Sequence, residues 1–259
     1  MNDIYNNLYS YFTSKDIKIV NYSFESIRRI SLEDIKMQIR NIVMFQKEFK
    51  GYKDNILPRI GSNIGKELEG YKVQVKNLEL DLEVINEKLD KNIVDIFLLE
   101  EGEKLLSKAR LSILDVESSN YIKLIRRSMM NYEVCLGSVT EENLRKGEDF
   151  RLEIGTIKYL NYNLFEQDMY SYLKYIKRKN CNVDIEYLIE YFVEESLLDE
   201  DSIEYLRGLV SYPFESLKLW DKYRRSKKKL TEQEYIDGFY KAKKIDSNDL
   251  IVKGDLFSE

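Results

Sequence analysis

The sequence of 259 residues contains no histidine, and this absence excludes several kinds of active site. Histidine supplies the base of Ser-His-Asp triads, the commonest metal ligand and the usual proton shuttle near neutral pH. The two cysteines, Cys135 and Cys181, are too few and too far apart for a zinc site or a disulfide framework. A serine nucleophile also lacks the imidazole that would activate it. We therefore expect neither triad chemistry nor a metal centre.

Long apolar runs and glycine-rich motifs are also missing. No apolar stretch reaches the ~18 residues of a membrane span, and the N-terminus lacks the basic and apolar regions of a signal peptide. No Gly-x-Gly-x-x-Gly occurs. The segment Gly61–Lys66 resembles a P-loop superficially, but it is one residue short, and Glu67 stands where Ser or Thr must reach magnesium. We expect a plain loop and a helix start there, and no membrane segment.

The composition is that of a folded globular protein, with 43% hydrophobic and 34% charged residues. The net charge of −5 argues against a general nucleic-acid role. A basic run at Arg224–Lys229 is interpreted as a solvated helix end, where the helix dipole favours cations. Contact with nucleic acid or anionic lipid is the alternative for this run. We expect no nucleic-acid partner and no cofactor.

Most of the chain has the periodicity of amphipathic helices. Ser31 is an N-cap signal, and apolar residues then recur at helical spacing until Gly51. Residues 66–90 carry an apolar seam with spacings of three and four over about three heptads. We interpret this seam as packing against the helices expected at 31–50 and 93–112, with a partner coiled coil as the alternative. Further helices are expected at 3–14, 93–114, 120–131, 167–179, from a cap at Asp184, and at 201–211, 214–225 and 231–244.

Residues 132–163 form the one long segment with strand signals. Tyr132–Leu136 alternates as a short strand does, and further strands are expected at 151–157 and 158–163. The charged stretch 141–151 between them is expected to be a loop or a helical turn, and 17–22 to be a short separate strand. The prediction is a mainly α (α+β) fold with a small antiparallel sheet or hairpin near residues 132–163.

The segment 132–163 also has the spacing of a phosphotransfer site in which the working groups are replaced. Kinase-type enzymes place a catalytic Asp after a strand, an Asn five residues later and a metal-binding Asp after a later strand. The corresponding positions here are Ser138, Asn143 and Asn161. Ser138 has no carboxylate to accept a proton, and Asn161 offers a neutral oxygen where a hard cation prefers an anionic one. A general base alone is typically worth about 10²–10⁴ in rate, so we expect negligible phosphotransfer.

With these motifs the chain resembles the spore-coat CotS family, a branch of the aminoglycoside-phosphotransferase-like kinases. The family's Cys-His-Gly-Asp-type motif reads Cys135–Ser138 here, with Leu136 in place of histidine. The family's Asn is Asn143, and its Ile-Asp-Phe-Asp-type motif has Asn161 and Asn163 at the two Asp positions. The resemblance covers roughly residues 31–230 and includes three further matching stretches: Phe45–Tyr52, Ile64–Lys66 and Leu209–Tyr223.

The resemblance implies a kinase-like C-terminal lobe at 31–245. A short remnant at 1–30 stands in place of most of the nucleotide lobe, and 246–259 is a polar tail. It further implies a pseudokinase rather than an enzyme, acting as a structural or scaffolding protein in spore coat assembly. The expected location is the mother-cell cytoplasm or the spore coat, and the expected partners are other coat proteins. Two alternatives stay open: a small-molecule or nucleotide-binding sensor that uses the remnant cleft, and a phosphotransferase completed by a partner chain.

Overall fold

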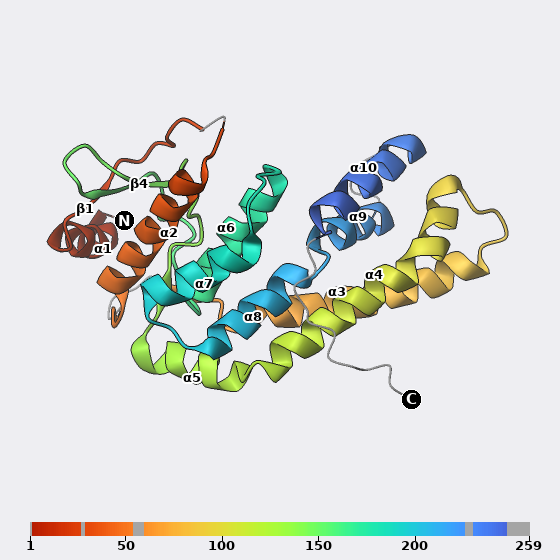
Figure 1. Ribbon diagram of the computed structural model, residues 1–259, viewed down its shortest axis with the longest axis horizontal. Helices are drawn as coiled ribbons and strands as arrows, with labels where there is room; N and C mark the ends of the chain where they lie inside the picture. Colours follow the sequence, from red (N-terminus) through yellow and green to blue (C-terminus); the bar gives the residue numbers. More distant parts are fainter. Residues whose placement is uncertain (1, 27–28, 54–59, 226–229, 248–259) are drawn as a thin grey trace. The chain divides into compact units, whose positions relative to one another are not determined.

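The computed structural model describes residues 2–26, 29–53, 60–225 and 230–247 (Figure 1). Its packing divides the chain into two compact units. The first consists of Met1–Ile64 and Asn120–Ile203, and the second of Gly65–Ser119 and Glu204–Glu259. The described structure is mostly helical with small mixed sheets, which confirms the predicted fold class. The lobe predicted at 31–245 stays a prediction, because compact packing units do not define a family domain.

The helices of the first unit follow the apolar periodicity of the sequence. Ser31 caps α2 in a capping box, in which its side chain accepts a hydrogen bond from the backbone N–H of Asp34. The buried face of α2 includes Ile35 and Ile39, and α2 packs against α7. The helices that this unit contains in full are α1 (Asn2–Ser14), α2 (Leu32–Phe49), α5 (Tyr121–Asn131), α6 (Glu166–Arg178) and α7 (Ile185–Ser196).

Two small three-stranded sheets also belong to the first unit. In one, β5 (Leu152–Ile154) lies between β1 (Ile17–Ile19), which is parallel to it, and β4 (Leu144–Lys146), which is antiparallel. In the other, β6 (Asn161–Tyr162) lies between β2 (Gly61–Ser62), again parallel, and β3 (Val134–Cys135), again antiparallel. Each antiparallel pair therefore gains a parallel strand from an earlier part of the chain.

Two local predictions about the strand region were wrong. The stretch 141–151 was expected to be a loop or a helical turn, but it contains β4. The physical reason is Leu144, which is fully buried and pairs with Ile154 of β5. The stretch Gly61–Lys66 was expected to be a plain loop before a helix, but Gly61–Ser62 forms β2 beside β6. The helix start at its end is confirmed, because α3 begins at Lys66.

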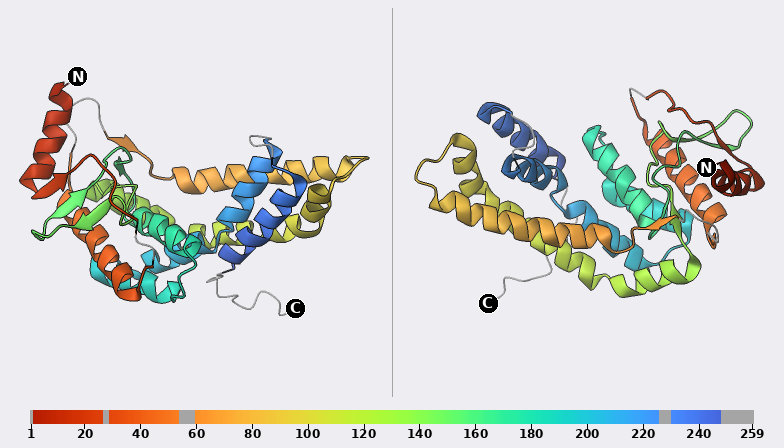
Figure 2. Two further views of the ribbon diagram at one scale, coloured as in Figure 1. Left: turned by 90° about the horizontal axis from the view of Figure 1, so that it is seen from above. Right: turned by 180° about the vertical axis from the view of Figure 1, so that it is seen from behind.

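The second unit is built on a long pair of helices, α3 (Lys66–Glu87) and α4 (Ile93–Ser118), which lie side by side in both views of Figure 2. The apolar seam of α3 packs within this unit against α4 and α9 (Phe214–Arg224). This confirms packing within the chain and the partner expected at 93–112, but α9 takes the place of the partner expected at 31–50. Leu89 is fully exposed, because the helix has ended before it. The unit also contains α10 (Glu232–Ile245) and the end of α8 (Glu200–Ser211), which begins in the first unit.

The core of the second unit depends on a close approach of α4 to a tryptophan. Trp220 of α9 is completely buried. A Cβ added at Gly102 of α4 would lie 2.9 Å from the Trp220 ring, so this position requires glycine. The Trp220 indole N–H donates to Asp81 Oδ2 at 2.7 Å. The packing of the Trp220 ring on α4 and its hydrogen bond to Asp81 of α3 thus fix α9 against the α3–α4 pair.

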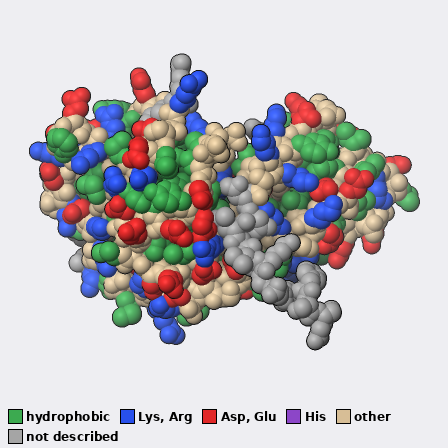
Figure 3. Space-filling view, viewed as in Figure 1, with side chains coloured by type: hydrophobic (Ala, Val, Ile, Leu, Met, Phe, Trp, Pro, Cys, Tyr) green, Lys and Arg blue, Asp and Glu red, His purple; other side chains and the backbone are tan. Residues whose placement is uncertain are grey.

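Two sequence expectations lie partly or wholly outside the described residues. The basic run Arg224–Lys229 is described only to Arg225, and Arg224 and Arg225 both pair with Asp221 on α9. The tail 246–259 is described only to residue 247. Over the described part of the chain, no helix is both long and apolar enough to cross a membrane. Acidic and basic side chains lie interspersed on the face shown in Figure 3.

Candidate functional site

The candidate site begins where β3 pairs with β6. Val134 lies opposite Tyr162 and Cys135 opposite Asn161 in this antiparallel pair. The Cys135 thiol donates to the backbone carbonyl of Leu164 at 3.0 Å, which fixes the end of β3 against the segment after β6. The site loop, defined here as residues 136–144, leaves β3 at this point. Asn161 and the site loop are thereby held next to each other within the first unit.

Asn143 closes the site loop through hydrogen bonds of its side-chain amide. The Asn143 side-chain amide donates to the carbonyl oxygens of Ser138 at 2.7 Å and Thr156 at 3.1 Å. Its Oδ1 accepts a hydrogen bond from the Thr156 N–H at 2.7 Å. The amide of Asn143 is thus used to hold the loop, while Ser138 stays partly exposed at its surface.

Asn161 presents one of the buried polar atoms around the site that lack a partner in the described structure, together with Gln46 Oε1 and Glu141 Oε2. Its side chain is only 7% exposed, and its Nδ2 donates to the carbonyl of Tyr159 at 2.8 Å. Among the described residues, the buried Oδ1 of Asn161 has no hydrogen-bond partner. A buried acceptor without a partner is costly unless a ligand or water satisfies it. The neighbouring Asn163 differs, because its Oδ1 accepts the N–H of Leu164 at 3.0 Å.

A buried carboxylate fixes the start of the site loop. Asp168 of α6 accepts the backbone N–H of Leu136 at 2.9 Å and that of Gly137 at 2.8 Å, one with each oxygen. Gly137 has a φ of +75°, and a Cβ there would lie 2.5 Å from the carbonyl oxygen of Tyr159. The loop therefore needs glycine at this position. Leu136 contributes its backbone N–H to this contact and buries its side chain completely.

Other side chains hold the remaining carbonyl groups around the site. Gln38 of α2 donates to the carbonyls of Val139 at 2.7 Å and Leu144 at 2.9 Å. Gln46, also on α2, donates to the carbonyl of Phe165 at 2.9 Å. These buried amides replace water as partners for the backbone, and so they keep the site loop in one conformation.

Arg127 of α5 connects three elements next to the site. It forms paired hydrogen bonds with Glu133, just before β3, at 2.8 and 3.1 Å, and with Glu166 of α6 at 2.9 and 2.7 Å. The Ser202 hydroxyl of α8 donates to Glu166 at 2.6 Å. Both carboxylates are almost completely buried. Burial is the largest cause that raises the pKa of Glu133, and Arg127 opposes it.

Sequence reasoning found Ser138, Asn143, Asn161 and Asn163 but missed the residues that hold them. Gln38 and Asp168 touch the site loop although they lie far from it in the sequence. The sequence carries no clear signal for Asp168, because the apolar face of the helix predicted at 167–179 consists of Met169, Leu173 and Ile176, and Asp168 lies about 140° around the helix from Leu173. The spacing alone could not show which backbone groups it accepts.

At the positions of Ser138, Asn143 and Asn161, a metal would meet neutral side chains. Over the described residues, no group of three His, Cys, Asp or Glu side chains is placed to hold a metal ion. Magnesium in nucleotide sites keeps water and phosphate oxygens as most of its ligands. The buried, unpartnered Oδ1 of Asn161 fits the role of one further oxygen ligand. A magnesium–nucleotide complex is thus compatible with this donor set, through Asn161.

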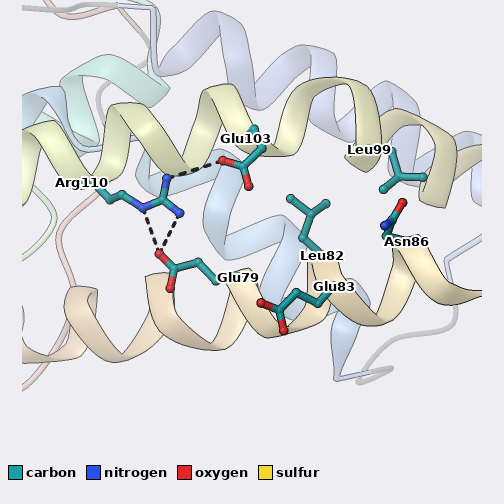
Figure 4. Close-up of a pocket in the computed structure, with 7 residues that line it drawn as sticks. All are labelled: Glu79, Leu82, Glu83, Asn86, Leu99, Glu103 and Arg110. Carbon is teal, nitrogen blue, oxygen red and sulfur yellow. Dashed lines mark hydrogen bonds and ion pairs between the residues drawn. The ribbon is translucent and has the colours of Figure 1, made fainter.

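A groove in the second unit contains none of these residues. It lies between α3 and α4, has a volume of about 530 Å³, and is lined by Glu79, Leu82, Glu83, Asn86, Leu99, Glu103 and Arg110 (Figure 4). Arg110 spans its end, with contacts to Glu79 at 2.9 Å and Glu103 at 3.5 Å. Two of its three carboxylates are therefore already paired with a cation.

Comparison with known proteins identifies the fold. No family model and no curated protein matches the chain. Among solved structures, the chain is similar to an aminoglycoside phosphotransferase from Alicyclobacillus acidocaldarius, with 12% identity and a TM-score of 0.69. The likeness covers 94% of this chain and 79% of that chain. The kinase-like fold of aminoglycoside phosphotransferases is thereby shown, whereas the finer assignment to the CotS family stays a prediction.

The prediction of a pseudokinase, not an enzyme, is contradicted by this likeness. The similar structure is a phosphotransferase, and the shared fold extends over 94% of the chain. The prediction rested on the neutral side chains of Ser138 and Asn161. Phosphoryl transfer, however, depends mainly on positioning and electrostatic stabilisation, with little covalent chemistry for the protein to perform. The missing carboxylates therefore do not place the chain outside the enzymes.

Asp168 predicts a pH dependence of stability. Burial raises its pKa from 3.8 to about 6, although the two backbone N–H groups oppose this shift. Because the pKa of Asp168 is higher in the folded than in the unfolded state, the folded state binds more protons than the unfolded state at pH values between these two pKa values. We expect the contribution of Asp168 to the free energy of unfolding to fall by about 2 kcal/mol as the pH rises from about 4 to about 6. Urea denaturation across this range measures the slope.

Asp168→Asn is the control for this titration. The variant should lose this part of the slope, because an amide does not titrate. It should also be less stable than the wild type at pH 5, because its NH₂ group faces one of the two backbone N–H donors. An unchanged slope in the variant would assign the pH dependence to another group.

Proposed function

We propose that the chain is a phosphotransferase that moves a phosphoryl group from a magnesium-bound nucleoside triphosphate to a hydroxyl group of a small molecule. The fold supports this proposal, and one observation carries it. In the antiparallel pair of β3 and β6, Cys135 lies opposite Asn161. This pairing sets Asn161 beside the loop of Ser138 and Asn143, in the order that kinase-type enzymes use.

The side chains would act mainly by positioning. Ser138 can hydrogen-bond the acceptor hydroxyl, but it cannot take its proton as a carboxylate would, so the proton would pass to a phosphate oxygen or to water as the nucleoside diphosphate leaves. Asn161 can offer its carbonyl oxygen to the cation, which neutralises the charge on the phosphate oxygens when it is bound. Asp168, Gln38 and Asn143 keep the site loop rigid, so that little reorganisation is needed during the reaction. We expect a rate about 10²–10⁴ below that of a site with a carboxylate base.

The test is transfer of labelled γ-phosphate from magnesium-ATP to a panel of hydroxylated small molecules. Aminoglycosides come first in the panel, because the similar solved structure is an aminoglycoside phosphotransferase. We expect product that depends on protein, magnesium and acceptor together. The proposal is wrong if no acceptor in the panel gives label above the protein-free background while the folded protein is present.

Asn161→Leu gives the specific variant, and Asn77→Leu its matched control. Asn161 is buried at the site, whereas Asn77 is a partly buried asparagine on α3 in the second unit. Loss of the unpartnered amide oxygen of Asn161 should lower transfer at least about tenfold, whereas the other ligands of magnesium are kept. Equal activity of both variants would show that Asn161 is not part of the working site.

Two other predicted functions can be distinguished from phosphotransfer by further experiments. A nucleotide sensor would bind magnesium-ATP in titration calorimetry without transferring phosphate. A scaffolding role among spore coat proteins stays a prediction from the family resemblance. It would be tested by co-purification of defined coat proteins from sporulating cells.

A further inference from the structure

One buried acidic side chain of the site loop has no part in the proposed chemistry. Glu141 lies between Ser138 and Asn143 in the sequence, and only 8% of it is exposed. Its Oε1 accepts a hydrogen bond from the hydroxyl of Tyr172 at 2.6 Å. Tyr172 is completely buried on α6. A carboxylate buried in a turn next to the reacting positions needs a structural or functional reason.

The placement of Tyr172 on α6 suggests that reason. Tyr172 follows Asp168 by four residues, and residues four apart lie on the same face of a helix. Asp168 accepts the backbone N–H groups of Leu136 and Gly137 at the start of the site loop. Tyr172 binds the middle of the same loop through Glu141. One face of α6 therefore holds the loop on both sides of Ser138.

We propose that Tyr172 is a positioning residue that acts through Glu141 to hold the part of the site loop between Ser138 and Asn143. The bond is charge-assisted and lies in a buried environment, where such hydrogen bonds are strong. Burial raises the pKa of Tyr172, and Glu141 raises it further, so the phenol stays a donor at neutral pH. Gln38 and Asn143 hold backbone groups of this segment, whereas Glu141 is held through its side chain.

The other groups around Glu141 are consistent with a dedicated contact. Tyr175, three residues after Tyr172, turns its ring almost parallel to that of Tyr172, with centroids 6.1 Å apart. Within the described residues, neither the Tyr175 hydroxyl nor Glu141 Oε2 has a hydrogen-bond partner. Removing the Tyr172 hydroxyl would therefore take away the short hydrogen bond to the buried Glu141 carboxylate, with the Tyr175 hydroxyl still close to it. Such a buried charge is relieved by movement of the loop toward water.

Hydrogen exchange on the full chain tests the inference, with Tyr172→Phe and Glu141→Ala as variants. Each should speed amide exchange in residues 138–144 by about 10- to 100-fold, which is the effect of losing one hydrogen bond to a charged group. The double variant should show no further increase, because both changes remove the same bond. Tyr191→Phe is the matched control, since Tyr191 is a tyrosine of α7 whose hydroxyl interacts with Glu195 and Arg40 and not with the site loop. It should leave exchange in residues 138–144 unchanged.

Two outcomes would overturn the inference. Unchanged exchange in residues 138–144 of both single variants would show that the bond does not hold the loop. Faster exchange spread evenly over the whole first unit would show only a general structural role. If Tyr172→Phe does not fold, Glu141→Ala still decides the question, because it leaves the helix core unchanged.

The catalytic meaning of Tyr172 rests on the proposed function, but the exchange measurement does not. If the wild type transfers phosphate, Tyr172→Phe should lower kcat about tenfold and leave KM for the nucleotide nearly unchanged. If the wild type transfers none, altered exchange still supports the positioning contact, and only the proposed function fails.

Discussion

Replacing Arg127 with methionine is expected to lower the free energy of unfolding by at least about 3–5 kcal/mol, because it leaves buried carboxylates without their cation. Glu133 and Glu166 are 1% and 0% exposed, and Arg127 donates two hydrogen bonds to each of them. Methionine fills a similar volume, so the loss would come from charge rather than from a cavity. Urea denaturation followed by far-ultraviolet circular dichroism measures the change.

The neighbouring Arg126→Met is the control for this prediction. Arg126 lies on the same helix but is exposed. Its replacement should change stability by less than about 0.5 kcal/mol. The effect of Arg127→Met should also shrink at acid pH, because Glu133, whose pKa burial raises, takes up a proton there and loses its charge. Equal effects of the two substitutions at neutral pH would contradict a charge network that supports the fold.

The double variant Ser138→Asp with Asn161→Asp is expected to raise the rate of phosphoryl transfer by about 10²–10⁴. It places an aspartate at each of the two positions where kinase-type enzymes have one. The first substitution supplies a carboxylate that can accept the proton of the attacking hydroxyl. The second supplies an anionic oxygen for magnesium. Initial rates with labelled ATP, at saturating acceptor, measure the gain. Ser138→Asn with Asn161→Asp is the matched control, since it keeps the shape at position 138 without a base.

The substitution Asn161→Asp is also expected to change the thermal stability, which can be measured without any phosphoryl transfer. In Asn161→Asp, an oxygen replaces the Nδ2 group that now donates to the Tyr159 carbonyl at 2.8 Å. Two acceptors would then face each other in a buried place, so the melting temperature should fall without metal. Magnesium-ATP should restore it by binding only to the folded state. A variant that melts like the wild type, with or without magnesium-ATP, would show that position 161 does not face the cation.

The helices could be predicted from the sequence because their signals are local. Ser31 and Thr231 each form the capping box that their spacing to Asp34 and Glu234 indicates. The strands β2 and β4 could not be predicted, because each is only two or three residues long. Their formation depends on pairing with β6 and β5, and β2 meets its partner from a distant part of the chain.

The candidate site, like the fold, could be predicted from the sequence only in part. Ser138, Asn143 and Asn161 follow from spacing along the chain, and the contact of Asn143 with the Ser138 carbonyl agrees with that spacing. The contacts of Asp168 and Tyr172 depend on how α6 packs against the site loop, which no spacing rule contains. The mistaken conclusion about activity came from judging the site by two missing carboxylates alone.

The fluorescence of Trp220 can report on the unfolding of the second unit. Trp220 is the single tryptophan of the chain, and it is completely buried in the second unit. Its fluorescence should shift to longer wavelength only when that unit opens and its indole meets water. Arg127 and the site loop lie in the first unit, where the intrinsic emitters are tyrosines and phenylalanines. The order in which the two units unfold can therefore be recorded without labels, by comparing tryptophan emission with circular dichroism along one denaturation curve.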